Sequence, residues 1–229
     1  YGSNNHKPID KKPCRLLHTL SKSGVGAKTT TRKKIVIVGG GIGGLGAGVA
    51  LRQKGFDCEV WERDAFFGSR SQGFGMTLNA DGCGPLAKLG VLEECRKLSC
   101  ESRCHWTFDK NGRVLGYYGR FSSSAGGDEE RGGNLRVQRQ QLRRVLLDKF
   151  QSLGGKIQWN KRVQDASEVD ADVVVGADGV NSRIRTCGPD LVDVGVSVVV
   201  GLSPYRHPLL EKQGIYVQDG PHRLITMPI

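Results

Sequence analysis

The sequence of 229 residues is long enough for one sizeable hydrophobic core, or for one domain and part of a second. Its apolar and charged content excludes a disordered or fibrous protein. The formal net charge of +11 admits an anionic partner, but no aromatic residues interleave with the basic ones near the N-terminus, so nucleic-acid binding is not favoured. No run approaches the roughly 18 apolar residues of a transmembrane helix, which excludes such a segment.

Residues 1–33 are predicted to form a basic extended arm or the remnant of a transit peptide. They are rich in Ser, Thr, Lys and Arg and almost free of acidic residues, as organelle-targeting segments are. We therefore expect an organellar protein, with the plastid slightly favoured over the mitochondrion; a disordered tail on a cytoplasmic protein is the alternative. The arm is also a candidate surface for protein partners. The first residue is Tyr1 rather than Met, which indicates a processed or partial chain.

The segment after the arm has the pattern of a βαβ unit. A strand, a glycine turn, a helix and a second strand are predicted at residues 34–38, 39–44, 45–54 and 57–61. Gly55 ends the helix and Glu62 lies at the tip of the second strand. These elements together occupy about 30 residues, which indicates a parallel α/β sheet.

The rest of the chain predicts further helices and strands. Next come an extended segment at 73–79, a helix at 84–98 broken near Gly90, a hairpin of 103–108 and 113–118 turning at Asn111-Gly112, a polar loop at 121–133 and a helix at 138–153. Strands are then predicted at 156–159, 171–175, 192–202, 214–217 and from 224 onward. The fully apolar strand at 171–175 is expected to be central and parallel, and those from 192 onward to begin an antiparallel sheet.

The seven cysteines show no paired spacing, which indicates a reducing compartment. Cys95, Cys100, Cys104 and His105 lie close together in the sequence and could form a metal site. Zinc sites usually have tighter paired spacing, so free thiols are the favoured interpretation and no metal ligands are predicted.

The turn at residues 39–44 has the pattern G-x-G-x-x-G directly after a strand. Gly39 permits the tight turn, Gly41 lets a diphosphate approach the backbone, and Gly44 lets the helix pack closely on the sheet. The helix N-terminus attracts the phosphates, and Glu62 is placed to accept hydrogen bonds from ribose hydroxyls. A carboxylate there repels a 2′-phosphate, so FAD or NAD is favoured over NADP; a purely structural βαβ unit is the alternative.

The stretch from residue 35 to residue 64 resembles the opening of class A FAD-dependent flavoprotein monooxygenases, a family of aromatic hydroxylases and zeaxanthin epoxidase-like enzymes. The resemblance lies in a GxGxxGL motif followed by Glu62-Arg63 at the second strand. The segment 73–79, with the Leu-Gly pair at 89–90, is similar to the strand and short helix that follow in the family.

Two later segments carry the same resemblance. Arg139 matches the arginine of the family's Arg-x-x-Leu helix start, which contacts the flavin, and Arg70 is a candidate for a similar part. The alternative is that the basic residues here form a solvated helix face, made of Arg136, Arg139, Arg143 and Arg144.

The segment from Gly176 to Arg185 resembles the family's G-A-D-G-x-x-S-x-[VI]-R motif. The resemblance implies that Asp178 accepts from a ribityl hydroxyl, that Gly179 allows the turn, and that Ser182 and Arg185 hold the next helix.

The resemblance implies a Rossmann-like FAD-binding βαβ domain with a parallel sheet, followed by the beginning of an antiparallel substrate-domain sheet. The expected domains are 34–186 for FAD binding, with insertions at 70–133, and 187–229 for the start of the substrate domain. The family's third flavin motif lies beyond Ile229, so the C-terminal part of the family fold is expected to be absent. The chain would then be a fragment, be completed by a second chain, or be a non-catalytic subunit.

The activity that the resemblance implies is a hydroxylase or epoxidase acting on a small molecule, with FAD, NADPH and O2, through a flavin C4a-hydroperoxide. An accessory subunit of a large organellar complex and a reductase of the geranylgeranyl reductase type are the alternatives. No catalytic residue is named. The candidate cofactor-binding residues are Gly39, Gly41, Gly43, Gly44, Glu62, Arg63, Arg70, Arg139, Asp178 and Gly179.

Overall fold

The computed structural model describes residues 33–69, 74–78, 80–100, 104–119, 135–185, 188 and 191–228. Several predictions lie outside these ranges: the arm up to residue 32, Arg70 and the polar loop at 121–133. None of the helices within the described ranges is long and apolar enough to cross a membrane.

A four-stranded, fully parallel sheet forms the centre of the larger part of the molecule, and it confirms the predicted βαβ unit. Its order is β7-β2-β1-β8, with bounds β1 Ile35–Val38, β2 Cys58–Trp61, β7 Lys156–Gln158 and β8 Val173–Gly176. Helix α1 (Ile42–Gln53) connects β1 to β2 and begins three residues earlier than the apolar pattern predicts. Because β1 pairs with both β2 and β8, the loops after these three strands meet at one edge of the sheet.

Alternating residues of the strands divide the core between the two faces of this sheet. Ile35 and Ile37 face α1 and the long helix α4 (Arg139–Ser152), whose apolar stripe includes Leu142, Leu146 and Phe150. Val36 and Val38 face the opposite way, toward the loop that contains the short helix η1 (Ala166–Glu168). The sheet is therefore covered by helices on one face and mainly by a loop on the other.

A second layer lies beside α4. Strands β3 (Gly75–Leu78) and β6 (Leu135–Gln138) pair antiparallel and lead directly into α4. The predicted helix around Gly90 is two helices, α2 (Ala80–Lys88) and α3 (Leu92–Leu98). Gly90 adopts a left-handed φ of 68° between them, which accounts for the break.

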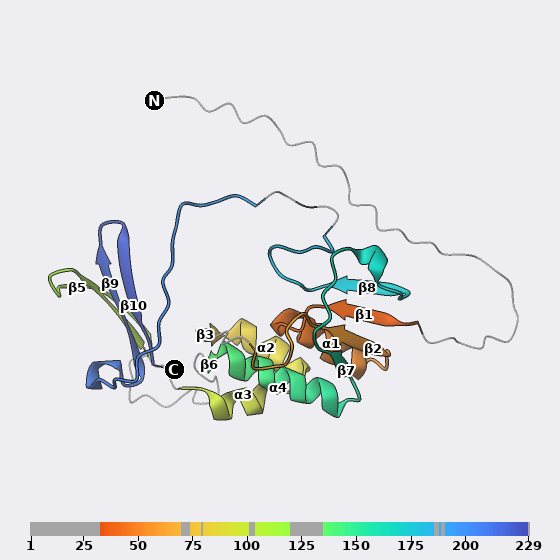
Figure 1. The fold of residues 1–229 in the computed structure, drawn as a ribbon. Coiled ribbons are helices and arrows are strands. Elements are labelled where there is room, and N and C mark those ends of the chain that lie inside the picture. The colour runs from red at the N-terminus through yellow and green to blue at the C-terminus, as the bar shows by residue number, and fades with distance from the viewer. Residues whose placement is uncertain are drawn as a thin grey trace, which may run out of the picture.

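The third sheet joins segments that are far apart in the sequence. Its order is β10-β9-β4-β5, with bounds β4 Cys104–Asp109, β5 Val114–Gly119, β9 Gln213–Asp219 and β10 His222–Thr226. β4 runs parallel to β9, and the other pairs are antiparallel. The hairpin from the insertion at 70–133 thus shares one mixed sheet with strands from the predicted second domain, as Figure 1 shows.

Three local predictions are wrong. Residues 192–202 form no strand but an extended, exposed connection from β8 toward β9, in which Val194 and Val198 are 80% and 78% exposed. A run of valines favours a strand only where a neighbouring strand pairs with its backbone, and none among the described residues does. β8 lies at the edge of its sheet, not at the centre, since within the described ranges it pairs with β1 alone. No helix follows Ser182 before residue 186.

Candidate functional site

The glycine turn leaves an open space at the N-terminus of α1. Gly41 is the residue before the helix, and no side chain caps it. A Cβ atom built on Gly41 or Gly43 would meet no atom within 4 Å. The first amides of a helix have no partner within the helix, and the first turn of α1 carries no acidic residue. This end of α1 can therefore receive a phosphate group without displacing a side chain.

The other two glycines of the motif are required by packing. Gly39 has a φ of 110°, and a Cβ there would overlap the carbonyl oxygen of Ala177. A Cβ on Gly44 would overlap the carbonyl oxygen of Gly39. The motif thus has two functions: Gly39 and Gly44 let three backbone segments pack closely, and Gly41 and Gly43 keep the space in front of the helix empty.

Glu62 is buried at the end of β2 and faces the glycine turn. Its Oε2 accepts a hydrogen bond from the amide of Gly40 at 2.7 Å, and its Oε1 accepts one from the amide of Asp64 at 3.0 Å. An ionised carboxylate has about four acceptor positions, so Glu62 retains capacity for a ribose hydroxyl. The hydrogen bond from Gly40 fixes the orientation of the Glu62 carboxylate, and Gly40 belongs to the glycine turn against which a dinucleotide would lie.

Arg143 connects α4 to this corner of the sheet. Its Nε donates to the carbonyl oxygen of Gly40 at 2.7 Å, and its Nη2 lies 3.6 Å from Glu62 Oε2 and 4.0 Å from Asp64 Oδ2. The guanidinium also stacks over the ring of Phe67, 5.0 Å from its centroid. Arg143 therefore supplies the positive charge that allows two buried carboxylates to sit beside the glycine turn.

The sequence allowed a solvated helix face made of Arg136, Arg139, Arg143 and Arg144, and this interpretation is wrong for two of them. Arg143 and Arg136 are 2% and 1% exposed. A usable signal for Arg143 was present in the sequence, because its spacing to Leu146, Leu147 and Phe150 places it on the apolar stripe of the helix. The sequence contained no such signal for Arg136. Three consecutive residues of β6 are buried, so no alternation of apolar and polar residues marks its buried face.

Asp178 lies in the turn that packs against Gly39, so the structure brings the glycine turn at 39–44 and the segment at 176–185 together. Its Oδ1 accepts from Ser182 Oγ and its Oδ2 from the amide of Arg183, both at 2.6 Å. Burial raises the pKa of Asp178, but these hydrogen bonds outweigh it and hold the pKa below its ordinary value. Gly179 has a φ of 96°, which the turn requires. Asp178 thus shapes its own loop with both oxygens.

The remaining arginines predicted for the site are placed differently. Arg139 is the first residue of α4; its amide donates to Phe74 and its Nη1 lies 3.9 Å from Met76 Sδ. Arg139 therefore joins the start of α4 to β3 and to the residue before it. Arg63 is exposed, and Arg70 lies outside the described residues.

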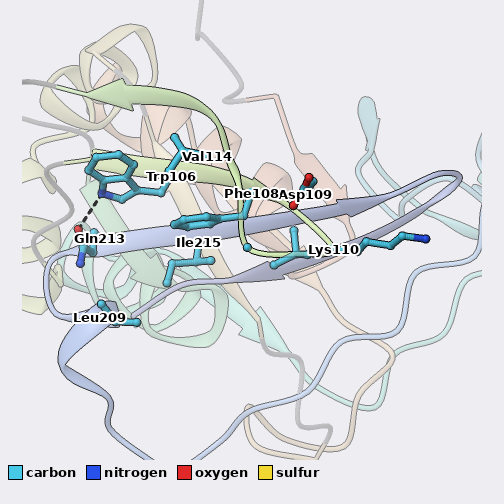
Figure 2. A pocket seen from close by; sticks show the side chains of 10 residues that line it. Trp106, Phe108, Asp109, Lys110, Val114, Leu209, Gln213 and Ile215 are labelled. Atoms are coloured by element: carbon cyan, nitrogen blue, oxygen red, sulfur yellow. Dashed lines mark hydrogen bonds between the residues drawn. The ribbon is translucent and has the colours of Figure 1, made fainter.

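The mixed sheet carries a hollow on each face, because alternate residues of β4 and β9 point to opposite sides. Figure 2 shows the first, an apolar hollow of about 570 Å³ whose walls include Trp106, Phe108, Ile215 and Leu209. The Trp106 indole donates to Gln213 Oε1 at 3.1 Å, as the dashed line in Figure 2 marks.

The second hollow, of about 520 Å³, lies on the side of β3 and is more polar. Its lining consists of Thr77, His105, Thr107, Tyr118, Tyr216, Gln218 and Met227. The sequence suggested His105 only as a metal ligand. In the structure it contacts Tyr216 and Arg136 instead, and the described part of the chain contains no group of three His, Cys, Asp or Glu side chains arranged for a metal ion.

Comparison with known proteins agrees with the resemblance seen in the motifs. The family model described as "FAD binding domain" matches residues 32–187. Among curated relatives, YetM of Bacillus subtilis, which is named as an FAD-dependent monooxygenase, is 30% identical over 168 residues, covering 67% of this chain and 44% of YetM. The chloroplastic zeaxanthin epoxidase of Prunus armeniaca is 29% identical over 187 residues, covering 69% of this chain and 27% of the epoxidase.

Solved structures show the same fold. The tetrameric form of 2-methyl-3-hydroxypyridine-5-carboxylic acid oxygenase matches with a TM-score of 0.57 and 25% identity, over 68% of this chain and 42% of the oxygenase. A variant of PqsL from P. aeruginosa matches with a TM-score of 0.62 over 86% of this chain and 57% of its own, at 20% identity. The chain spans less than half the length of the two curated relatives named above.

Proposed function

Because the chain belongs to the FAD binding domain family, we propose that it binds FAD and serves an FAD-dependent monooxygenase that uses NADPH and O2. The predicted family and fold are confirmed by the comparisons, and FAD is the cofactor that the family description gives. The reaction would place one oxygen atom on a small molecule by hydroxylation or epoxidation. Bound FAD would supply the electron transfer and the activation of O2 that no side chain can supply.

The residues described here suit the ADP part of FAD. The open end of α1, in front of Gly41 and Gly43, would hold the diphosphate by backbone amides and by the helix dipole. Glu62 would accept from the ribose, with its carboxylate already turned toward the glycine loop by Gly40. Asp178 and Arg139 are proposed to lie nearer the flavin. Asp178 would act there by fixing the shape of its turn, because both of its oxygens accept hydrogen bonds within that loop.

The observation that carries the proposal is the division of the glycines. A structural βαβ unit needs only the close packing that Gly39 and Gly44 provide. It gives no reason for glycine at positions 41 and 43, where a side chain would enter open space. A ligand that approaches the backbone at the helix end does give such a reason.

The test is a pair of glycine substitutions in the same helix region. Gly41 has a φ of −76°, which any residue adopts, so Gly41→Ala should fold normally but place a methyl group where the diphosphate lies. The methyl group should cost the diphosphate at least one charge-assisted hydrogen bond to the backbone amides. The loss of one such bond raises the Kd for FAD about tenfold or more. Gly46→Ala is the matched control, because its Cβ would make only an ordinary 3.8 Å contact with Leu89.

Kd values would be measured by flavin fluorescence, and folding by circular dichroism. Equal FAD affinity in Gly41→Ala and the parent protein would contradict the proposed placement. A parent protein that folds but binds no FAD would instead favour the accessory-subunit alternative. If FAD binds, product analysis after NADPH addition separates oxygen transfer from double-bond reduction, the reductase alternative.

A further inference from the structure

A methionine and an arginine contact each other where β3 meets the start of α4. The Sδ atom of Met76 on β3 lies 3.9 Å from Nη1 of Arg139, the first residue of α4. The backbone fixes this approach, because β3 pairs antiparallel with β6, which leads directly into α4. The amide of Arg139 also donates to the carbonyl oxygen of Phe74, the residue before β3, at 3.1 Å. The thioether and the guanidinium are therefore held next to each other.

A thioether is a poor partner for this cation. Its sulfur is a weak hydrogen-bond acceptor, so the contact gives the guanidinium little of what a carbonyl or carboxylate oxygen would give. Oxidation to the sulfoxide changes this, because it adds a polar oxygen to the same sulfur atom. Hydrogen bonds in which the donor is charged are the stronger ones. The cation of Arg139 therefore favours the oxidised form of Met76 over the reduced form.

Met76 is placed where a small oxidant can reach it, since its side chain is half-buried at the margin of the core. The sequence has one other methionine, Met227, which is also half-buried and lines the more polar hollow. The side chains around Met227 in that hollow carry hydroxyl, imidazole and amide groups. The two methionines are thus similar in exposure, and the guanidinium neighbour distinguishes Met76.

We propose that Met76 is an oxidative modification site whose sulfoxide is held by Arg139. Hydrogen peroxide is the oxidant. The sulfur lone pair attacks one peroxide oxygen, the O–O bond breaks, and the leaving hydroxide takes the proton of the transferred oxygen to become water. The sulfur loses two electrons and the peroxide gains them. Arg139 keeps its protons and donates a hydrogen bond to the sulfoxide oxygen. Methionine sulfoxide reductases reverse the change, so the site acts as a switch.

The modification bears on cofactor binding through the same arginine. Arg139 is proposed above to lie near the flavin, and this step alone rests on the proposed function. A guanidinium engaged by a sulfoxide oxygen has fewer donors left for the cofactor, so oxidation weakens FAD binding. The proposed reaction also supplies the oxidant, because O2 that takes up two electrons and two protons without transferring an oxygen atom becomes hydrogen peroxide. Met76 thus lowers FAD occupancy when the reaction runs without a substrate.

The first test uses the purified FAD-free protein, treated with hydrogen peroxide and analysed by peptide mass spectrometry. Met76 should gain one oxygen atom while the circular dichroism spectrum stays that of the folded protein. The guanidinium is then probed with phenylglyoxal, which modifies accessible arginine side chains. Oxidation should slow the modification of Arg139 about tenfold, as a hydrogen bond made by a charged group predicts. The exposed Arg63 is the control and should react equally before and after oxidation.

The second test measures the Kd for FAD by flavin fluorescence before and after peroxide treatment. The Kd of the parent protein should rise about tenfold. Met76→Leu keeps the side-chain volume but has no sulfur, so its Kd should stay within about twofold. Met227→Leu is the matched control and should respond as the parent does. The cysteines are the same in all three proteins, so a rise shared by Met76→Leu would belong to thiol oxidation.

Each outcome decides the inference. Oxidation of Met227 but not of Met76 in the folded protein overturns it, and so does an Arg139 whose reactivity is the same in the sulfoxide form. A rise in Kd that Met76→Leu shares also overturns it. A protein that binds no FAD refutes the proposed function, while mass spectrometry and arginine reactivity still decide the modification. One that binds FAD equally before and after oxidation of Met76 refutes this inference and leaves the proposed function standing.

Discussion

Replacing Arg143 by Met would remove the cation that holds the glycine turn, Glu62 and Asp64 together. The methionine fills most of the volume but loses the 2.7 Å bond to Gly40 and leaves two carboxylates, 9% and 3% exposed, without their guanidinium. Breaking a buried ion pair on one side costs about 3–5 kcal/mol. Such a loss is a large share of the roughly 5–15 kcal/mol by which domains are usually stable.

The assay is urea unfolding followed by circular dichroism, with Arg144→Met as the matched control. Arg144 is the next residue of α4, but its side chain is 50% exposed, with Asp148 3.7 Å away and the Phe67 ring centroid 3.7 Å from its guanidinium carbon, so its loss should cost about 1 kcal/mol. The double variant Glu62→Gln with Arg143→Met should recover part of the loss, because it removes one uncompensated charge. If Arg143→Met and Arg144→Met lower the unfolding free energy equally, the reasoning fails.

Three further predictions concern packing, pH and thiol reactivity. Gly44→Ala should lower the unfolding free energy by about 3 kcal/mol or more, because the methyl group overlaps the Gly39 carbonyl; a urea midpoint equal to that of Gly46→Ala would contradict this. The pKa of His105 is lowered below 6.5, so the unfolded chain binds the extra proton and stability should fall as the pH drops below about 6.5; His105→Gln should flatten that dependence in pH-resolved unfolding. Burial, with smaller contributions from Glu94 and Cys83, raises the pKa of Cys95 to about 11, so mass spectrometry should find it unalkylated by iodoacetamide at pH 8 until urea is added.

The βαβ unit could be predicted because each of its elements depends on neighbours close in the sequence. Apolar strands, a glycine turn and a carboxylate after the second strand specify the local geometry, and the structure places Glu62 against Gly40 as that pattern requires. The pattern could not predict which glycines allow close packing of the backbone and which leave space for a ligand. Whether Gly39 or Gly41 faces another backbone depends on the Asp178 turn, which lies more than a hundred residues further along the chain.

The mixed sheet and its hollows could not be predicted from the sequence. The parallel pairing of β4 with β9 joins residues about a hundred positions apart, and nothing in either strand's alternation specifies that partner. For the same reason the contacts of His105 with Arg136 and Tyr216 had no signal. Each residue comes from a different strand, and only the pairing of the strands brings them together. The valine run at 192–202 shows the converse case, a strong strand propensity without a partner strand among the described residues.

The central claim is that the glycine turn and Glu62 recognise the ADP part of FAD, and competition binding tests it most directly. FAD bound to the purified protein would be displaced with ADP or with FMN, which contains the flavin but no adenosine, and followed by flavin fluorescence. We predict that ADP competes with FAD and that FMN binds much more weakly than FAD. Failure of ADP to compete, or equal binding of FMN and FAD, would show that the open end of α1 does not hold the dinucleotide.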